Sequence, residues 1–91
     1  MKSFLITCEL NNRYGDYQPL IDKITGFGGQ WYCCMNYVWI IKSNLSPNDI
    51  LIILKSNIYE NDKILVVQLV RNVSWAGLTT DEEAWLSSNL E

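Results

Sequence analysis

The fold is decided by the stretch Lys2-Ser3-Phe4-Leu5-Ile6-Thr7-Cys8-Glu9-Leu10. Its side chains alternate between two faces, which is the period-two pattern of a β-strand. The predicted core face carries Phe4, Ile6, Cys8 and Leu10. Glu9 lies near the end of the opposite face, so we expect a carboxylate there, beside a loop that supplies amide, guanidinium and phenol groups.

A helix is predicted over residues 17–27, where Asp16 can cap the first turn and apolar side chains recur at a spacing of three and four. Gly26 and the glycines after it end this helix. Residues 30–34 and 37–43 are aromatic and β-branched runs, and the two residues between them predict a hairpin turn.

The second half of the chain again predicts a helix followed by a strand. Ser46-Pro47-Asn48-Asp49 is typical of a helix start, and residues 63–70 read as a strand. Thr80-Asp81-Glu82-Glu83 predicts a capping box that opens a short C-terminal helix. The apolar stripe of the middle helix is expected at Ile50, Ile53, Leu54 and Ile58, and that of the last helix at Trp85, Leu86 and Leu90.

The order strand, helix, strand, strand, helix, strand predicts an α+β fold of the ferredoxin-like type. Two right-handed crossovers would interleave into a four-stranded antiparallel sheet with two helices on one face. We expect residues 1–91 to form one domain, with residues from about 72 to 91 as a C-terminal extension that ends in a short helix.

Composition narrows the classes of function. The 91 residues carry 7 basic and 10 acidic side chains, so extended nucleic acid is not expected as a partner. The chain has no His, which excludes Ser–His and Cys–His nucleophile pairs. Cys8, Cys33 and Cys34 are expected to be reduced thiols. We recognise no signal peptide or membrane span, so a cytoplasmic protein is expected.

The chain contains six short motifs of note: Thr7-Cys8-Glu9-Leu10-Asn11, Gly15-Asp16-Tyr17, Trp31-Tyr32, Trp39-Ile40-Ile41-Lys42, Asn61-Asp62-Lys63-Ile64-Leu65-Val66-Val67 and Trp75-Ala76-Gly77. Together they resemble the SinR-like small proteins of bacterial and phage sequence sets, which are distinct from the helix-turn-helix repressor of that name. The group looks related in fold to the CRISPR-associated Cas-two proteins. This resemblance implies a ferredoxin-like homodimer.

Some Cas-two proteins cut nucleic acid with a metal held by an Asp at the end of the first strand. By position that role would fall on Glu9, with Mg²⁺ or Mn²⁺ as the cofactor. The family usually has Asp after Tyr here, whereas this chain has Glu9 after Cys8, which displaces the carboxylate by about one methylene. A carboxylate that bonds loop N–H groups, Lys or Arg is the alternative interpretation of Glu9.

The predicted strands are apolar on both faces, so we expect a second copy of the chain to cover the sheet face that the helices leave open. The expected interface residues are Leu5, Thr7, Ile41, Ile64, Val66, Gln68 and Val70. Ligand contacts are expected where the first loop meets this interface. The candidates are Glu9, Asn11, Asn12, Arg13, Tyr14, Trp39 and Lys42, although aromatic residues are often core or interface and charged ones often solvated.

The sequence therefore favours a non-catalytic, homo-oligomeric protein that binds or sequesters a nucleotide-like ligand or a partner protein. For a phage gene, the ligand would be a host defence signal. The alternatives are a Cas-two-like nuclease that depends on a divalent metal at Glu9, and a structural adaptor subunit. The first hypothesis requires no cofactor, and none of the three requires a membrane.

Overall fold

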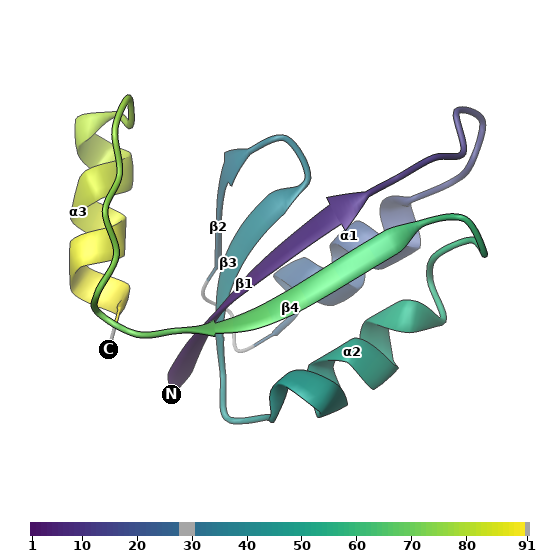
Figure 1. Ribbon diagram of the computed structural model, residues 1–91, viewed down its shortest axis with the longest axis horizontal. Helices are drawn as coiled ribbons and strands as arrows, with labels where there is room; N and C mark the ends of the chain where they lie inside the picture. The colour runs from purple at the N-terminus through teal and green to yellow at the C-terminus, as the bar shows by residue number, and fades with distance from the viewer. Residues whose placement is uncertain (28–30, 91) are drawn as a thin grey trace.

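The computed structural model describes residues 1–27 and 31–90, the side chains of 31–34 excepted. It shows an α+β domain, which confirms the predicted fold class at this level (Figure 1). The elements are β1 Lys2–Glu9, α1 Gln18–Thr25, β2 Trp31–Met35, β3 Val38–Ser43, α2 Pro47–Lys55, β4 Lys63–Leu69 and α3 Thr80–Asn89.

The strands form one antiparallel sheet in the order β2-β3-β1-β4, so the first strand of the chain lies inside the sheet. The pairing of β1 with β4 is regular, from Ser3 opposite Leu69 to Glu9 opposite Lys63. The pairing of β2 with β3, by contrast, shifts register between Cys33 and Met35. The two edges of the sheet, β2 and β4, therefore differ in regularity.

Helices α1 and α2 pack on one face of the sheet, where they form the main core. This core confirms the predicted inner face of β1, because Phe4 and Ile6 are fully buried and Cys8 and Leu10 pack against them. Its buried members are Phe4, Ile6, Leu20, Ile24, Trp39, Ile41, Ile50 and Leu54.

The other face of the sheet carries α3, which lies apart from α1 and α2 in Figure 1. Leu86 and Leu90 of this helix are buried together with Ile40, and Leu5 and Leu69 pack against the three. The inward positions predicted for Leu86 and Leu90 are thus confirmed. The chain's own tail covers part of the face that the sequence assigned to a second copy.

The set of β4 residues predicted to face away from the helices was wrong, because the alternation is shifted by one position. Opposed residues in an antiparallel sheet share a face, and Ile64, Val66 and Gln68 stand opposite residues of β1 that face the helices. Leu65, Val67 and Leu69 face the other way. Because both sets are apolar, the alternation along β4 gives no sign of which one faces the core.

Ile41 and Trp39 were also placed on the wrong side. They stand opposite Phe4 and Ile6 on the helix side of the sheet, where Ile41 is fully buried and Trp39 is 5% exposed. Neither side chain can therefore reach a second copy or a ligand on the outer face. Val38 and Ile40 take the outer positions of β3.

The structure confirms one predicted helix start and shifts another by one residue. Ser46 caps α2 as predicted, since its hydroxyl accepts from the Asp49 N–H at 3.1 Å. The capping box of α3 lies one residue earlier than predicted and joins Thr79 to Glu82. In α2, Ile53 proves to be exposed, because the short helix turns it away from the sheet.

Candidate functional site

Two loops meet at the end of the sheet where β1 finishes and β4 begins, and Asp62 joins them. The residue is buried, with 8% of its surface exposed. The carboxylate accepts from the backbone N–H groups of Asn11 at 2.7 Å and Tyr59 at 2.9 Å. The hydroxyl of Tyr17, at 2.8 Å, and the side-chain amide of Asn12, at 3.2 Å, complete the set.

These hydrogen bonds determine the charge of Asp62. Burial by itself acts to raise the pKa of this carboxyl, but the hydrogen bonds from Asn11, Tyr59, Tyr17 and Asn12 outweigh it and hold the pKa below its usual range. Asp62 is therefore ionised at neutral pH, with its acceptor positions occupied by the protein. This arrangement indicates an anchor for the two loops.

Further contacts fix the loops around this carboxylate. The amide groups of Asn11 and Asn12 donate to the carbonyl and the side-chain oxygen of Asn61, at 2.7 and 2.6 Å. The Tyr59 hydroxyl accepts from the Asp16 N–H at 3.0 Å. Asn11 and Asn12, both candidate ligand contacts, therefore already use their amide groups within the chain.

Beside this anchor, Glu9 and Lys63 are exposed and face each other across the β1–β4 pair. The Lys63 Nζ lies 3.3 Å from Glu9 Oε2, and the Asn11 amide donates to the same oxygen at 3.4 Å. The hydrogen bond from Asn11 and then the Lys63 ammonium lower the pKa of the Glu9 carboxyl. Glu9 is thus a solvent-accessible anion with a cation beside it.

A pocket of about 200 Å³ opens at this pair, and we call it the Glu9–Lys63 groove. Its lining is formed by Thr7, Cys8, Glu9, Lys63, Ile64 and Leu65. Burial and the nearby Asp62 carboxylate raise the pKa of the Cys8 thiol to about 11. Cys8 is therefore a neutral wall residue, whereas the charged groups of the groove are Glu9 and Lys63.

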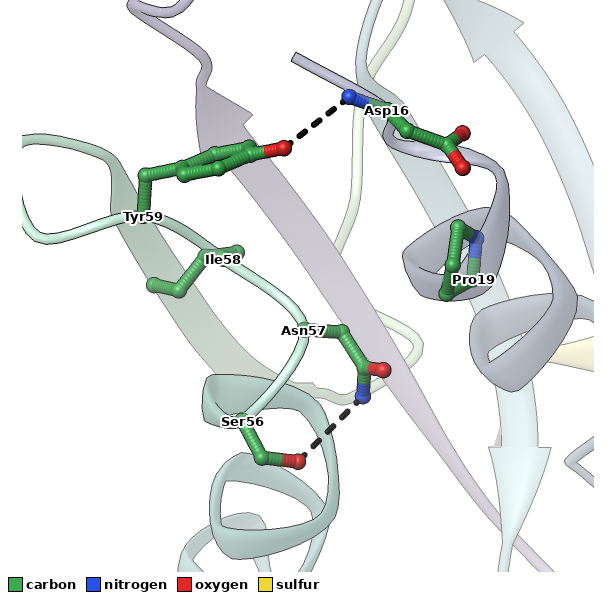
Figure 2. A pocket seen from close by; sticks show the side chains of 6 residues that line it. All are labelled: Asp16, Pro19, Ser56, Asn57, Ile58 and Tyr59. Carbon is green, nitrogen blue, oxygen red and sulfur yellow. Dashed lines mark hydrogen bonds between the residues drawn. The ribbon is translucent and has the colours of Figure 1, made fainter.

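A second pocket, of about 250 Å³, lies between the start of α1 and the end of α2 (Figure 2). It is lined by Asp16, Pro19, Ser56, Asn57, Ile58 and Tyr59. The Tyr59 hydroxyl is turned to the Asp16 backbone and the Asn57 amide to the Ser56 hydroxyl, at 3.5 Å. The Asp16 carboxylate accepts from the Gln18 N–H at 3.0 Å, so these polar groups already have partners within the chain. No pattern in the sequence predicted this pocket.

The structure separates the remaining ligand candidates. Arg13 and Tyr14 lie on the loop surface, where the Arg13 Cζ sits 5.8 Å from the ring centre of Tyr14. Lys42 stands opposite Ser3, at the other end of β1 from Glu9, a distance of roughly 20 Å for six strand residues. Of the seven candidates, the structure gathers Glu9, Asn11 and Asn12, excludes Trp39 by burial and places Lys42 far away.

The residues of this site do not fit a metal ion held by one chain. Among the side chains that the structure describes, no group of three or more His, Cys, Asp or Glu residues could hold one. In addition, the Lys63 ammonium occupies the position beside Glu9 Oε2 that a cation would take.

No helix in the described part of the chain is both long and apolar enough to cross a membrane. Comparisons with models of protein families, with curated proteins and with solved structures give no match to this chain.

Proposed function

We propose that this chain is a homo-oligomeric binding protein that captures a nucleotide-like ligand in the Glu9–Lys63 groove. The observation that carries the proposal is the pairing of an exposed anion and an exposed cation 3.3 Å apart at the rim of a pocket with an apolar wall. This combination suits a nucleotide, which has a donor edge, an anionic phosphate and a flat apolar ring.

Each part of the groove matches one part of such a ligand. The Glu9 carboxylate can accept from the N–H groups on the edge of a base. The Lys63 ammonium can bind a phosphate as a point charge once the ligand separates it from Glu9. Ile64, which lines the groove beside them, offers an apolar surface for the ring.

We also propose that the fold is the ferredoxin-like sandwich and that the chain is related to the SinR-like proteins. The strand order β2-β3-β1-β4, with α1 and α2 on one face, supports the first point. In a cytoplasm, a protein of this kind would act by lowering the free concentration of its ligand. For a phage gene, that ligand would be a nucleotide signal of host defence.

Titration calorimetry with purine and pyrimidine mononucleotides and with cyclic dinucleotides tests the proposed ligand class. We expect one group of these nucleotides to bind, and Glu9→Gln and Lys63→Gln each to weaken binding by about tenfold or more, as expected for the loss of a charge-assisted hydrogen bond. The matched controls are Glu60→Gln and Lys55→Gln, which remove the same charges at exposed positions outside the groove.

Three results would overturn this function. The first is the absence of measurable heat with every nucleotide, and the second is an equal loss of binding in the controls. The third is cleavage of labelled RNA or DNA in Mg²⁺ or Mn²⁺ that Glu9→Gln abolishes, which would identify a nuclease instead. Native mass spectrometry of the freshly purified protein adds a direct search for a bound nucleotide.

A further inference from the structure

We propose that a second copy of this chain pairs with the free edge of β4, antiparallel and strand to strand, with the twofold axis at Val66. This inference deepens the proposed function, because it names the contact that makes the protein an oligomer and that completes the groove. It replaces the face-to-face contact expected from the sequence, since α3 covers part of that face.

The first observation is that β4 has a long unpaired edge. In the described part of the chain, β1 is the sole strand partner of β4, along the whole length of Lys63–Leu69. Every second residue of an edge strand points its N–H and C=O outward, and these groups form a template for another strand. The outer edge of β4 is therefore available to a strand from another chain.

The second observation is that this edge has few of the features that keep edge strands apart. Lys63, the first residue of β4, is its one charged residue, and residues 64–70, Ile-Leu-Val-Val-Gln-Leu-Val, have no charge and no Pro. The pairing of β4 with β1 has no bulge, whereas the opposite edge, β2, carries a register shift. Soluble proteins usually protect a free edge with Lys, Pro or a bulge. The regular apolar edge of β4 therefore favours pairing.

Side-chain complementarity selects the register. With the twofold axis at Val66, Leu65 of each copy stands opposite Val67 of the other, on the outer face of the sheet. These two side chains are 57% and 39% exposed in the single chain, and pairing would bury them against each other. The four residues would form one apolar cluster across the axis.

Charge selects the antiparallel direction. In this register the two Lys63 ammonium groups lie at opposite ends of the seam, roughly 20 Å apart, which is beyond the screening length of about 8 Å at physiological salt. A parallel pairing would place them side by side. Each Lys63 instead lies near Leu69 and Val70 of the other copy, so the second copy supplies an apolar wall to the Glu9–Lys63 groove.

Analytical ultracentrifugation of the full chain tests the pairing. We expect the wild-type protein to sediment as a dimer at micromolar concentration. Leu65→Lys and Val67→Glu should each raise the dissociation constant at least tenfold, because a charge would enter the apolar cluster. The matched control is Met35→Lys, since Met35 is 60% exposed and lies on β2, at the opposite edge of the sheet from the seam.

A mixture of the two variants tests the register. The ammonium introduced at position 65 of one copy would stand opposite the carboxylate introduced at position 67 of the other. An equimolar mixture of Leu65→Lys and Val67→Glu should therefore dimerise more tightly than either variant alone. Far-UV circular dichroism of each variant checks that it is folded. A monomeric wild type, an equal effect of Met35→Lys, or a mixture no tighter than its components would overturn the pairing.

The outcomes separate this inference from the proposed ligand. A monomer that binds a nucleotide through Glu9 would overturn the β4 pairing and leave the ligand class standing. A dimer that responds to the Leu65 and Val67 variants but binds no nucleotide would support the pairing and overturn the ligand class.

Discussion

The hydroxyl of Tyr17 lies 2.8 and 2.9 Å from the two carboxylate oxygens of Asp62, although the residues are 45 positions apart in the chain. The same hydroxyl accepts from the Asn12 N–H at 3.0 Å. One phenol thus links the start of α1, the loop that follows β1 and the loop that precedes β4. This link holds the charged end of the sheet in a single arrangement beside the Glu9–Lys63 groove.

Tyr17→Phe should destabilise the protein by about 1 to 2 kcal/mol, because it leaves the partly buried Asn12 N–H without its acceptor and takes a donor from Asp62. Urea unfolding followed by tryptophan fluorescence measures the change. Tyr14→Phe is the matched control, since Tyr14 is 94% exposed and should lose almost nothing. Equal losses in the two variants would show that the link contributes little.

Asp62 should make the protein less stable in acid. The pKa of its carboxyl is lower in the folded chain than in the unfolded one, so its contribution is present above the unfolded pKa of about 3.9. That contribution is lost as the pH falls through the lower pKa of the folded chain. Urea midpoints from pH 7 to pH 2 should therefore fall more steeply for the wild type than for Asp62→Asn.

The control for this pH series is Glu60→Gln, which removes a carboxylate from an exposed neighbouring position. The fall of its urea midpoint from pH 7 to pH 2 should equal that of the wild type. If the midpoint of Asp62→Asn falls as far as that of the wild type, the acid sensitivity belongs to other carboxylates, such as Glu9.

Gly15→Ala should destabilise the loop by about 1 to 2 kcal/mol through overpacking. A Cβ at this position would lie 2.6 Å from Cε2 of the Tyr59 ring and 3.1 Å from the Cβ and the carbonyl oxygen of Asn12. The ring can move only by giving up the hydrogen bond from the Asp16 N–H. Urea unfolding measures the cost.

The same substitution in a Tyr59→Ala variant tests whether the Tyr59 ring is the group that the new methyl meets. Introduced into Tyr59→Ala, Gly15→Ala should cost at most half as much, because the ring that it meets is gone. An unchanged cost in that background would point to the backbone of Asn12 in place of the Tyr59 ring.

Thr79→Ala should loosen α3 by about 1 kcal/mol, because it removes the side-chain acceptor of a capping box. Amide hydrogen exchange within α3 should then be several times faster, and Leu86 and Leu90 should become accessible to a hydrophobic dye. Thr80→Ala is the control, since the cap of this helix is Thr79. A faster exchange in Thr80→Ala than in Thr79→Ala would place the cap one residue later.

Local and periodic signals predicted most of the elements. The alternation in β1 identified its core face because one set of positions ends in polar residues. In β4 both sets of alternating residues are apolar, so its orientation is set only by the register in which it pairs with β1. Trp39 and Ile41 were misplaced for the same reason, since an interior strand is apolar on both faces.

The site was harder to predict, because its main contacts are distant in the chain. Glu9, Asn11 and Asn12 were found from the strand end and its loop. Asp62 was missed as an anchor, although a lone carboxylate directly before a strand start is a signal that could have drawn attention to it. Its partners include Asn11, 51 positions earlier in the chain, as well as the nearby Tyr59. No local sequence pattern shows that a loop N–H so far away will donate to that carboxylate.

If copies pair through β4 as proposed, the register shift at β2 would limit how far they assemble. A strand with an irregular register is a poor template, whereas the proposed twofold contact would occupy the regular β4 edge of both copies. The sheet would then grow at one end only, and growth would stop when two chains have met. The protein would form closed pairs and resist building filaments, even at high concentration.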